Sequence, residues 1–254
     1  MDSTTTESVT VERLGNLTVV RFHWLGAPIG MNLDTTEVLW RFIELEKSQP
    51  SKVLMVFFAP ELIGPNSLEM LTEGDGLGEP TVGWSVEPQR LRGMVREGNL
   101  LRRWVEAVRA LPTYVIGVVQ GEVALRRMAP VLACDYRIAA DDTTIVNTLQ
   151  EMPVAPTAGL PWFLTRLIGP ARTTHVLLEM TKLSAQQARG LGLMNFLAPT
   201  DMLEEKALEV AQKFAAMPQA TLVGVKRAMV ASSEDLSTYL DRESDLVRKL
   251  SASS

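Results

Sequence analysis

The chain has 254 residues and a formal net charge of −5, with 46% hydrophobic and 22% charged side chains. This composition excludes an intrinsically disordered chain, and the acidic balance argues against a nucleic-acid or anionic-membrane partner. A single cysteine, Cys134, excludes an internal disulfide, and the two histidines lack a metal-ligand spacing, so we predict no metal site.

The N-terminal segment is polar and acidic, without the positive and apolar regions of a signal peptide. The longest apolar stretches are far shorter than the roughly 20 residues of a membrane span. We therefore predict a cytoplasmic protein with no membrane partner. Residues 1–8 are expected to be disordered, residues 9–198 to form an α/β core, and residues 199–254 to form a helical region of the same continuous domain.

The first predicted elements are strands and one helix. Residues 9–12 and 17–22 are β-branched runs on either side of Gly15, which predicts a hairpin. Apolar residues at helical spacing predict a helix from about residue 32 to 47. Residues 53–58 form a continuous apolar run of buried-strand length.

Residues 60–96 contain many glycines, prolines and acidic residues, and they are too numerous for a plain connection. We expect a lid or binding loop there. A helix follows from near residue 97, and strands are predicted at 115–119, 135–140 and 143–146. The pattern after residue 160 is almost entirely helical. Its predicted helices are 161–168, 171–181, 185–190, 200–216, 219–231 and 234–250.

Five motif blocks in chain order share the spacing of one known family. The most specific block joins a strand ending at Gly121 to Cys134-Asp135 and a following Arg137-Ile138-Ala139-Ala140 strand. The other blocks are Pro28 with Asn32, Pro156-Thr157-Ala158-Gly159 with 164–169, 183–193, and Met217-Pro218 with Lys226. With these blocks the chain resembles the crotonase (enoyl-CoA hydratase/isomerase) superfamily over about residues 9–250.

The resemblance implies an α/β spiral of repeated ββα units followed by helices that mediate formation of a trimer or a dimer of trimers. Leu236, Tyr239 and Leu240 in the helical tail have no obvious local core, which favours such an assembly. The resemblance also implies a CoA or acyl-carrier thioester as substrate and no separate cofactor. Two backbone N–H groups of the family form an oxyanion hole that stabilises an enolate.

Both oxyanion positions depart from the family pattern. The second donor belongs to a Gly-Gly-Gly run, and this chain has Leu125, Arg126 and Arg127 there. Arg126 can still donate its backbone N–H, and either arginine can bind an anionic substrate group or the CoA phosphates. Alternatively, both arginines fill the pocket or pair with acidic residues. The first donor is Leu62 in an ungapped alignment, or Pro65, which has no N–H, in a gapped one.

The two glutamates of the family's hydratases fall on Ala129 and Leu149, which carry no proton. The chain therefore resembles an atypical member of this family, and ordinary hydration is not expected. Glu151 is the remaining candidate for acid/base chemistry, with a solvent-facing loop carboxylate as the alternative. His23 and His175 are interpreted as structural residues.

Three further residues are candidates for substrate binding. Thr148 adds a hydroxyl, and Thr157 falls where some family isomerases place an aspartate. Lys226 corresponds roughly to a lysine that approaches the adenine end of CoA, with a solvated helix lysine as the alternative.

Two functions remain open at this point. The first is an acyl-thioester enzyme that catalyses isomerisation, hydrolysis, decarboxylation or retro-Claisen cleavage. The second is a catalytically silent homologue that serves as a partner or scaffold subunit. An open cleft lined by Leu62, Arg126 and Glu151 favours the enzyme, and a cleft filled by Leu125, Arg126 and Met152 favours the scaffold.

Overall fold

The computed structural model describes residues 3–5, 9–22, 33–64, 88–149, 155–232 and 235–252. Seven strands form one mixed sheet in the spatial order β1 (Ser3–Thr5), β2 (Val9–Leu14), β3 (Leu17–Phe22), β4 (Val53–Phe58), β5 (Tyr114–Val119), β7 (Tyr136–Ala140) and β10 (Phe196–Ala198). A second sheet contains β6 (Glu122–Ala124), β8 (Thr144–Val146) and β9 (Lys182–Ser184). The strand–helix alternation and the two sheets confirm the predicted α/β class.

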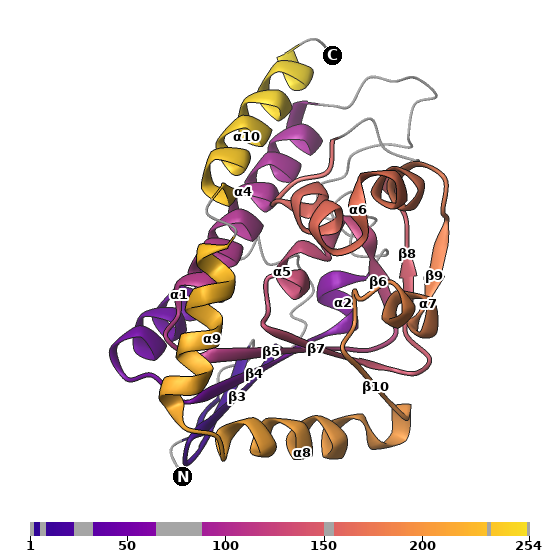
Figure 1. Cartoon of the computed structure of the whole chain (residues 1–254). Helices are drawn as coiled ribbons and strands as arrows, with labels where there is room; N and C mark the ends of the chain where they lie inside the picture. The colour runs from indigo at the N-terminus through magenta and orange to yellow at the C-terminus, as the bar shows by residue number, and fades with distance from the viewer. Residues whose placement is uncertain are drawn as a thin grey trace.

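Helices cover both faces of the large sheet (Figure 1). They are α1 (Leu33–Ser48), α2 (Pro60–Ile63), α4 (Pro88–Ala110), α5 (Ala129–Leu132), α6 (Leu160–Leu178), α7 (Ala185–Gly190), α8 (Leu203–Ala215), α9 (Gln219–Ala231) and α10 (Leu236–Ala252), with 3-10 turns η2 (Leu125–Arg127) and η4 (Thr200–Met202). In Figure 1, α8 lies below the edge-on sheet, whereas α4, α5 and α6 lie above it.

The side chains of β4 show why the large sheet is covered on both faces. Leu54, Val56 and Phe58 pack into the core that includes α4, α5 and α6 residues. Val53 and Met55 pack into a second core, to which α8 contributes. Successive strand side chains point to opposite faces, so a strand buried on both sides reads as a continuous apolar run.

The hairpin predicted around Gly15 is present, because β2 and β3 pair antiparallel and Gly15 adopts a φ of 62°. The other predicted strands correspond to β4, β5, β7 and β8. The helical region after residue 160 is also confirmed, although α6 continues to Leu178 through a break at Gly169 (φ 77°).

Three expectations need correction. Ser3–Thr5 pair with β2 as β1, so these residues of the N-terminal segment are ordered. Helix α4 begins at Pro88 rather than near residue 97, which shortens the predicted loop of residues 60–96. Helix α2 occupies the beginning of that loop, and residues 65–87 lie outside the described residues.

The helical tail does have a local core, contrary to the expectation from sequence. Leu236 is 6% exposed and Leu240 is fully buried, and both belong to the core on the α4 side of the sheet. Helix α10 lies beside α4 (Figure 1), and Arg102 of α4 donates to Asp241 of α10 at 2.7 Å. Burial against the chain itself therefore accounts for these apolar residues without a partner.

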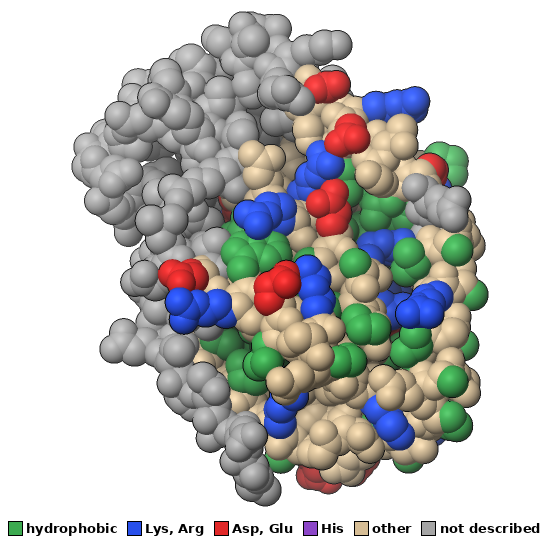
Figure 2. Space-filling model, turned by 90° about the vertical axis from the view of Figure 1, so that its left-hand side faces the viewer, with side chains coloured by type: hydrophobic (Ala, Val, Ile, Leu, Met, Phe, Trp, Pro, Cys, Tyr) green, Lys and Arg blue, Asp and Glu red, His purple; other side chains and the backbone are tan. Residues whose placement is uncertain are grey.

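The surface of the molecule mixes charges of both signs. Figure 2 shows Lys and Arg side chains interspersed with Asp and Glu and with hydrophobic side chains on the side where α1 and α9 lie in Figure 1. Within the described ranges, none of the helices combines the length and apolar character that crossing a bilayer requires.

Candidate functional site

The two segments predicted to supply oxyanion donors lie next to each other. Strands β4 and β5 are parallel neighbours, so α2, which follows β4, and β6, which follows β5, start at the same edge of the sheet. Gly64 at the end of α2 is so close to β6 that a Cβ there would lie 3.1 Å from the Glu122 carbonyl oxygen. Nη1 of Arg127 lies 3.5 Å from the Gly64 carbonyl oxygen, which joins η2 to the same place.

Leu62 occupies the first turn of α2, where backbone N–H groups have no acceptor within the helix. This position is compatible with a donor role for its backbone. Pro65, the alternative position, lies outside the described residues, as do Glu151 and Met152. Their predicted roles stay predictions.

Arg126 and Arg127 are buried side chains that share one carboxylate. Nη1 of Arg126 donates to Oε2 of Glu97 at 3.0 Å, and Nη2 of Arg127 lies 2.7 Å from Oε1 of the same residue. Arg126 is 9% exposed, Arg127 is 2% exposed and Glu97 is 8% exposed. The cluster therefore occupies the place where the resemblance puts a run of glycines.

Glu97 and Arg127 stay ionised despite their burial. Burial by itself raises the pKa of Glu97, but the charges of Arg127 and Arg126 outweigh it and hold that pKa below its ordinary value. Burial lowers the pKa of the Arg127 guanidinium to about 10, with Glu97 opposing and Arg126 adding to the shift. Both groups therefore remain charged near neutral pH.

Glu97 is a member of the site that was not predicted from sequence. It lies on α4 and faces the core together with Leu101, Trp104 and Val108, which follow at helical spacing. A carboxylate on an otherwise apolar helix face needs a cationic partner, and two consecutive arginines in an apolar segment need an anionic one. The lone carboxylate on α4 and the two adjacent arginines together indicate that Glu97 pairs with Arg126 and Arg127.

Ala129 and Leu149, onto which the sequence resemblance places the hydratase glutamates, are apolar residues in apolar surroundings. Ala129 opens α5 and is fully buried, and Leu149 is half-buried against the core. The Leu149 backbone N–H donates to Oδ1 of Asn147 at 3.0 Å. Asn147 in turn donates to the carbonyl oxygens of Leu177 and Met180, each at 2.9 Å, which anchors the segment to the end of α6.

Thr148 and Thr157 are the two hydroxyl candidates. Thr148 is 8% exposed, and its Oγ1 has no hydrogen-bond partner within the described part of the chain. Thr157 lies against α4, because a Cβ added to Gly98 would be 3.4 Å from Thr157 Oγ1. The Thr157 hydroxyl thus lies beside Gly98, the residue that follows Glu97 on α4.

Helix α10 fixes the segment that contains Thr157. Ala158 and Gly159 adopt left-handed φ angles of 58° and 81°, and the Gly159 N–H donates to Oε1 and Oε2 of Glu243 at 3.2 and 3.1 Å. Burial raises the pKa of Glu243 to about 7, and the Gly159 N–H bond only partly offsets this. The Glu243 carboxyl therefore titrates near neutral pH.

Lys226, predicted to approach CoA, has internal partners for its ammonium. Its ammonium lies 2.9 Å from Oδ2 of Asp135 and donates to the carbonyl oxygens of Val108 and Thr113 at 2.9 and 2.8 Å. These contacts match the three donors of an ammonium, and the residue is 3% exposed. Lys226 ties α9 to the end of α4 and to the start of β5, which is a structural role.

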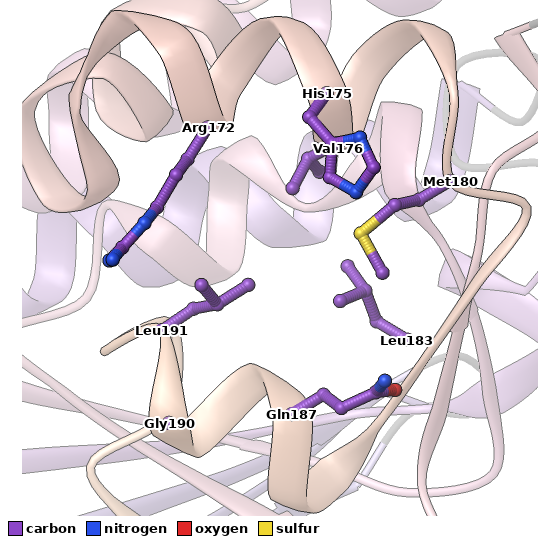
Figure 3. A pocket seen from close by; sticks show the side chains of 8 residues that line it. All are labelled: Arg172, His175, Val176, Met180, Leu183, Gln187, Gly190 and Leu191. Atoms are coloured by element: carbon purple, nitrogen blue, oxygen red, sulfur yellow. The ribbon is translucent and has the colours of Figure 1, made fainter.

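One surface pocket, of about 340 Å³, lies between α6 and α7 (Figure 3). Val176, Met180, Leu183 and Leu191 give it an apolar lining, and Figure 3 shows His175 at its edge on α6. None of the predicted site residues lines this pocket, and His175 was interpreted from the sequence as a structural residue. His175 is exposed and lies 3.2 Å from Glu179, one turn further along the same helix.

Neither a metal centre nor a reactive thiol emerges from the described residues. Within those ranges, no group of three His, Cys, Asp or Glu side chains converges on a point that could hold a metal ion. Burial raises the pKa of the Cys134 thiol to about 12, so the thiol stays protonated at neutral pH.

A family model described as enoyl-CoA hydratase/isomerase matches residues 92–254 of the chain. The enoyl-CoA isomerase/hydratase fer4 of Mycosarcoma maydis is 31% identical over 147 residues, which cover 58% of this chain and 53% of that relative. The match therefore spans about half the length of this curated relative.

Two solved structures share the architecture over nearly the whole chain. The enoyl-CoA hydratase from Mycobacterium avium subsp. paratuberculosis K-10 has a TM-score of 0.76 at 20% identity, covering 97% of this chain and 95% of the other. The enoyl-CoA hydratase from Bacillus halodurans has a TM-score of 0.75 at 19% identity, covering 95% of this chain and 94% of the other. These likenesses show the crotonase fold.

Proposed function

The chain belongs to the enoyl-CoA hydratase/isomerase family, and we propose that it acts on a CoA or acyl-carrier thioester by stabilising an enolate rather than by hydrating an enoyl group. Backbone N–H groups of the segments at Leu62 and Arg126 are the proposed oxyanion donors. The proximity of α2 to β6 and η2 supports this pairing, because the two donors must converge on one thioester oxygen.

The observation that carries the proposal is the apolar character of Ala129 and Leu149. Hydration needs a group that takes a proton from water and a group that returns one to the substrate. Alanine and leucine can do neither, whereas enolate stabilisation by backbone N–H groups needs no side chain. Decarboxylation forms the enolate with loss of CO2 and needs no base. Isomerisation, hydrolysis and C–C cleavage also need a group that moves a proton, for which Glu151 is the candidate.

A second function is favoured by the internal pairing of both arginines with Glu97. Side chains that satisfy one another inside the molecule are what a filled, silent site would contain. In that case the chain is a catalytically silent homologue that serves as a partner or scaffold subunit. The two functions differ in one property, which is the binding of acyl-CoA.

Isothermal titration calorimetry with butyryl-CoA and with free CoA separates the two functions. If the chain is an enzyme, we expect saturable binding of the thioester with a dissociation constant between about 1 μM and 1 mM, the usual range for enzyme substrates. Absence of heat from both ligands at millimolar concentration would overturn the proposed function and favour the silent homologue.

A further inference from the structure

Arg126 has an unused edge of its guanidinium inside the protein. Its Nη1 donates to Glu97 at 3.0 Å, but Nε and Nη2 are buried and have no hydrogen-bond partner among the residues that the structure describes. The residue is 9% exposed, so water does not replace the missing acceptors at its surface. Burial of a charged group with unmet hydrogen bonds is costly, and such groups are normally paired.

The unused donors have a specific geometry. Nε and Nη2 lie on the same edge of the planar guanidinium and point their N–H bonds in parallel. Two parallel N–H donors match the two oxygens of a carboxylate, which is why arginine binds carboxylates with two hydrogen bonds. The Arg126 edge therefore has the shape of a carboxylate site rather than that of a single-acceptor site.

The local charge also favours an anion at this edge. Glu97 divides its carboxylate between the two arginines, with Oε2 at Arg126 and Oε1 at Arg127. Its single negative charge thus serves two guanidinium groups. The electrostatic repulsion between Arg126 and Arg127 contributes to the lowered pKa of Arg127. A ligand carboxylate on the free edge of Arg126 would relieve that repulsion.

The place of Arg126 in the fold connects this edge to the reacting group. Arg126 lies in η2, and its backbone is one of the two proposed oxyanion donors. A carboxylate held by its side chain would therefore lie within one acyl chain of the thioester carbon. We propose that the substrate is an acyl thioester whose acyl group carries a carboxylate, the monothioester of a dicarboxylic acid, and that Arg126 binds this carboxylate. This inference rests on the proposed function.

Calorimetric titration of the full chain with succinyl-CoA and with butyryl-CoA tests the inference. The two ligands have four-carbon acyl chains and share the CoA moiety, so they differ in the terminal carboxylate. We expect succinyl-CoA to bind at least about tenfold more tightly, the low end of the effect of a hydrogen bond to a charged group. Equal affinities would overturn the inference while leaving the proposed function in place.

The variant Arg126→Gln identifies the residue responsible. It removes the guanidinium, keeps a polar side chain and leaves Glu97 paired with Arg127. We expect the preference for succinyl-CoA to disappear, so that the two dissociation constants of the variant agree within about threefold. A control is Arg103→Gln on α4, which removes an arginine that stacks on Trp40 outside the cluster and should leave the preference intact.

Other outcomes are equally informative. If Arg126→Gln weakens both thioesters to the same extent, Arg126 binds the CoA phosphates, and the inference about the acyl group is wrong. If neither thioester binds to the wild-type protein, the proposed function fails and the inference fails with it. The wild-type comparison needs no variant, so a variant that does not fold leaves the test valid.

Discussion

The Glu97 carboxylate lies 3.0 Å from Nη1 of Arg126, although the two residues come from different elements, α4 and η2. Because Glu97 also lies 2.7 Å from Arg127, it holds two cationic side chains inside the core. Breaking a buried ion pair leaves an uncompensated charge, and this cost is larger than the gain from forming the pair.

We therefore expect Glu97→Gln to lower the free energy of unfolding by about 3–5 kcal/mol. Urea unfolding of the variant and the wild type measures this difference. Glu106→Gln is the matched control, because Glu106 lies on the same helix with a side chain that is 42% exposed. The control should change stability by less than about 0.5 kcal/mol. A Glu97 variant as stable as the control would show that the cluster is not a buried ion pair.

Lys226 should matter for stability and not for CoA. Lys226→Met removes the ammonium between Asp135 and two carbonyl oxygens, and we expect a loss of about 3 kcal/mol. The affinity of the folded variant for butyryl-CoA should stay within about twofold of the wild type. Lys213→Met, at an exposed position of α8, serves as the control. A large loss of CoA affinity in a stable Lys226 variant would restore the original interpretation.

Because its pKa is raised, Glu243 should make the folded protein less stable as the pH rises. Its pKa is about 7 in the folded protein against an ordinary value of 4.5, so between these values the folded state binds more protons than the unfolded state. The free energy of unfolding therefore falls as the pH rises through this window, by about 3 kcal/mol in total, and levels off above it.

Glu243→Gln should abolish this fall, because glutamine has no proton to lose and can still accept from the Gly159 N–H. Unfolding midpoints at about pH 5 and about pH 8 measure the difference. Asp241→Asn, at an exposed position of the same helix, should leave the pH dependence as in the wild type. A Glu243 variant with the wild-type slope would mean that this carboxyl ionises normally.

A trimer or a dimer of trimers remains a prediction, and α9 is the surface on which to test it. Val225 and Met229 are 53% and 66% exposed and lie one turn apart on this helix. Light scattering at micromolar concentration should give three or six times the chain mass of 28.0 kDa. The double variant Val225→Glu, Met229→Glu should reduce that mass. A monomeric wild type would remove the prediction.

Sequence patterns predicted the elements whose structure depends on their own local sequence. The continuous apolar run of β4 and the Gly15 turn are local signals, and both elements form as predicted. The start of α4 was missed by nine residues, because Gly93 and scattered charges obscure the helical period before Glu97. The contacts of Glu97 with Arg126 and of Lys226 with Asp135 join distant segments, and periodicity within one element does not report them.

The assay of crotonyl-CoA hydration tests the central claim most directly. The sequence resemblance places the glutamates of the family's hydratases on Ala129 and Leu149, so we predict no measurable hydration by the wild-type protein. Ala129→Glu combined with Leu149→Glu should not restore full activity, because Arg126 and Arg127 still occupy the place of the glycine run. Hydration by the wild-type protein at ordinary enzymatic rates, about ten per second or more, would contradict the assignment of these positions and the chemistry proposed from them.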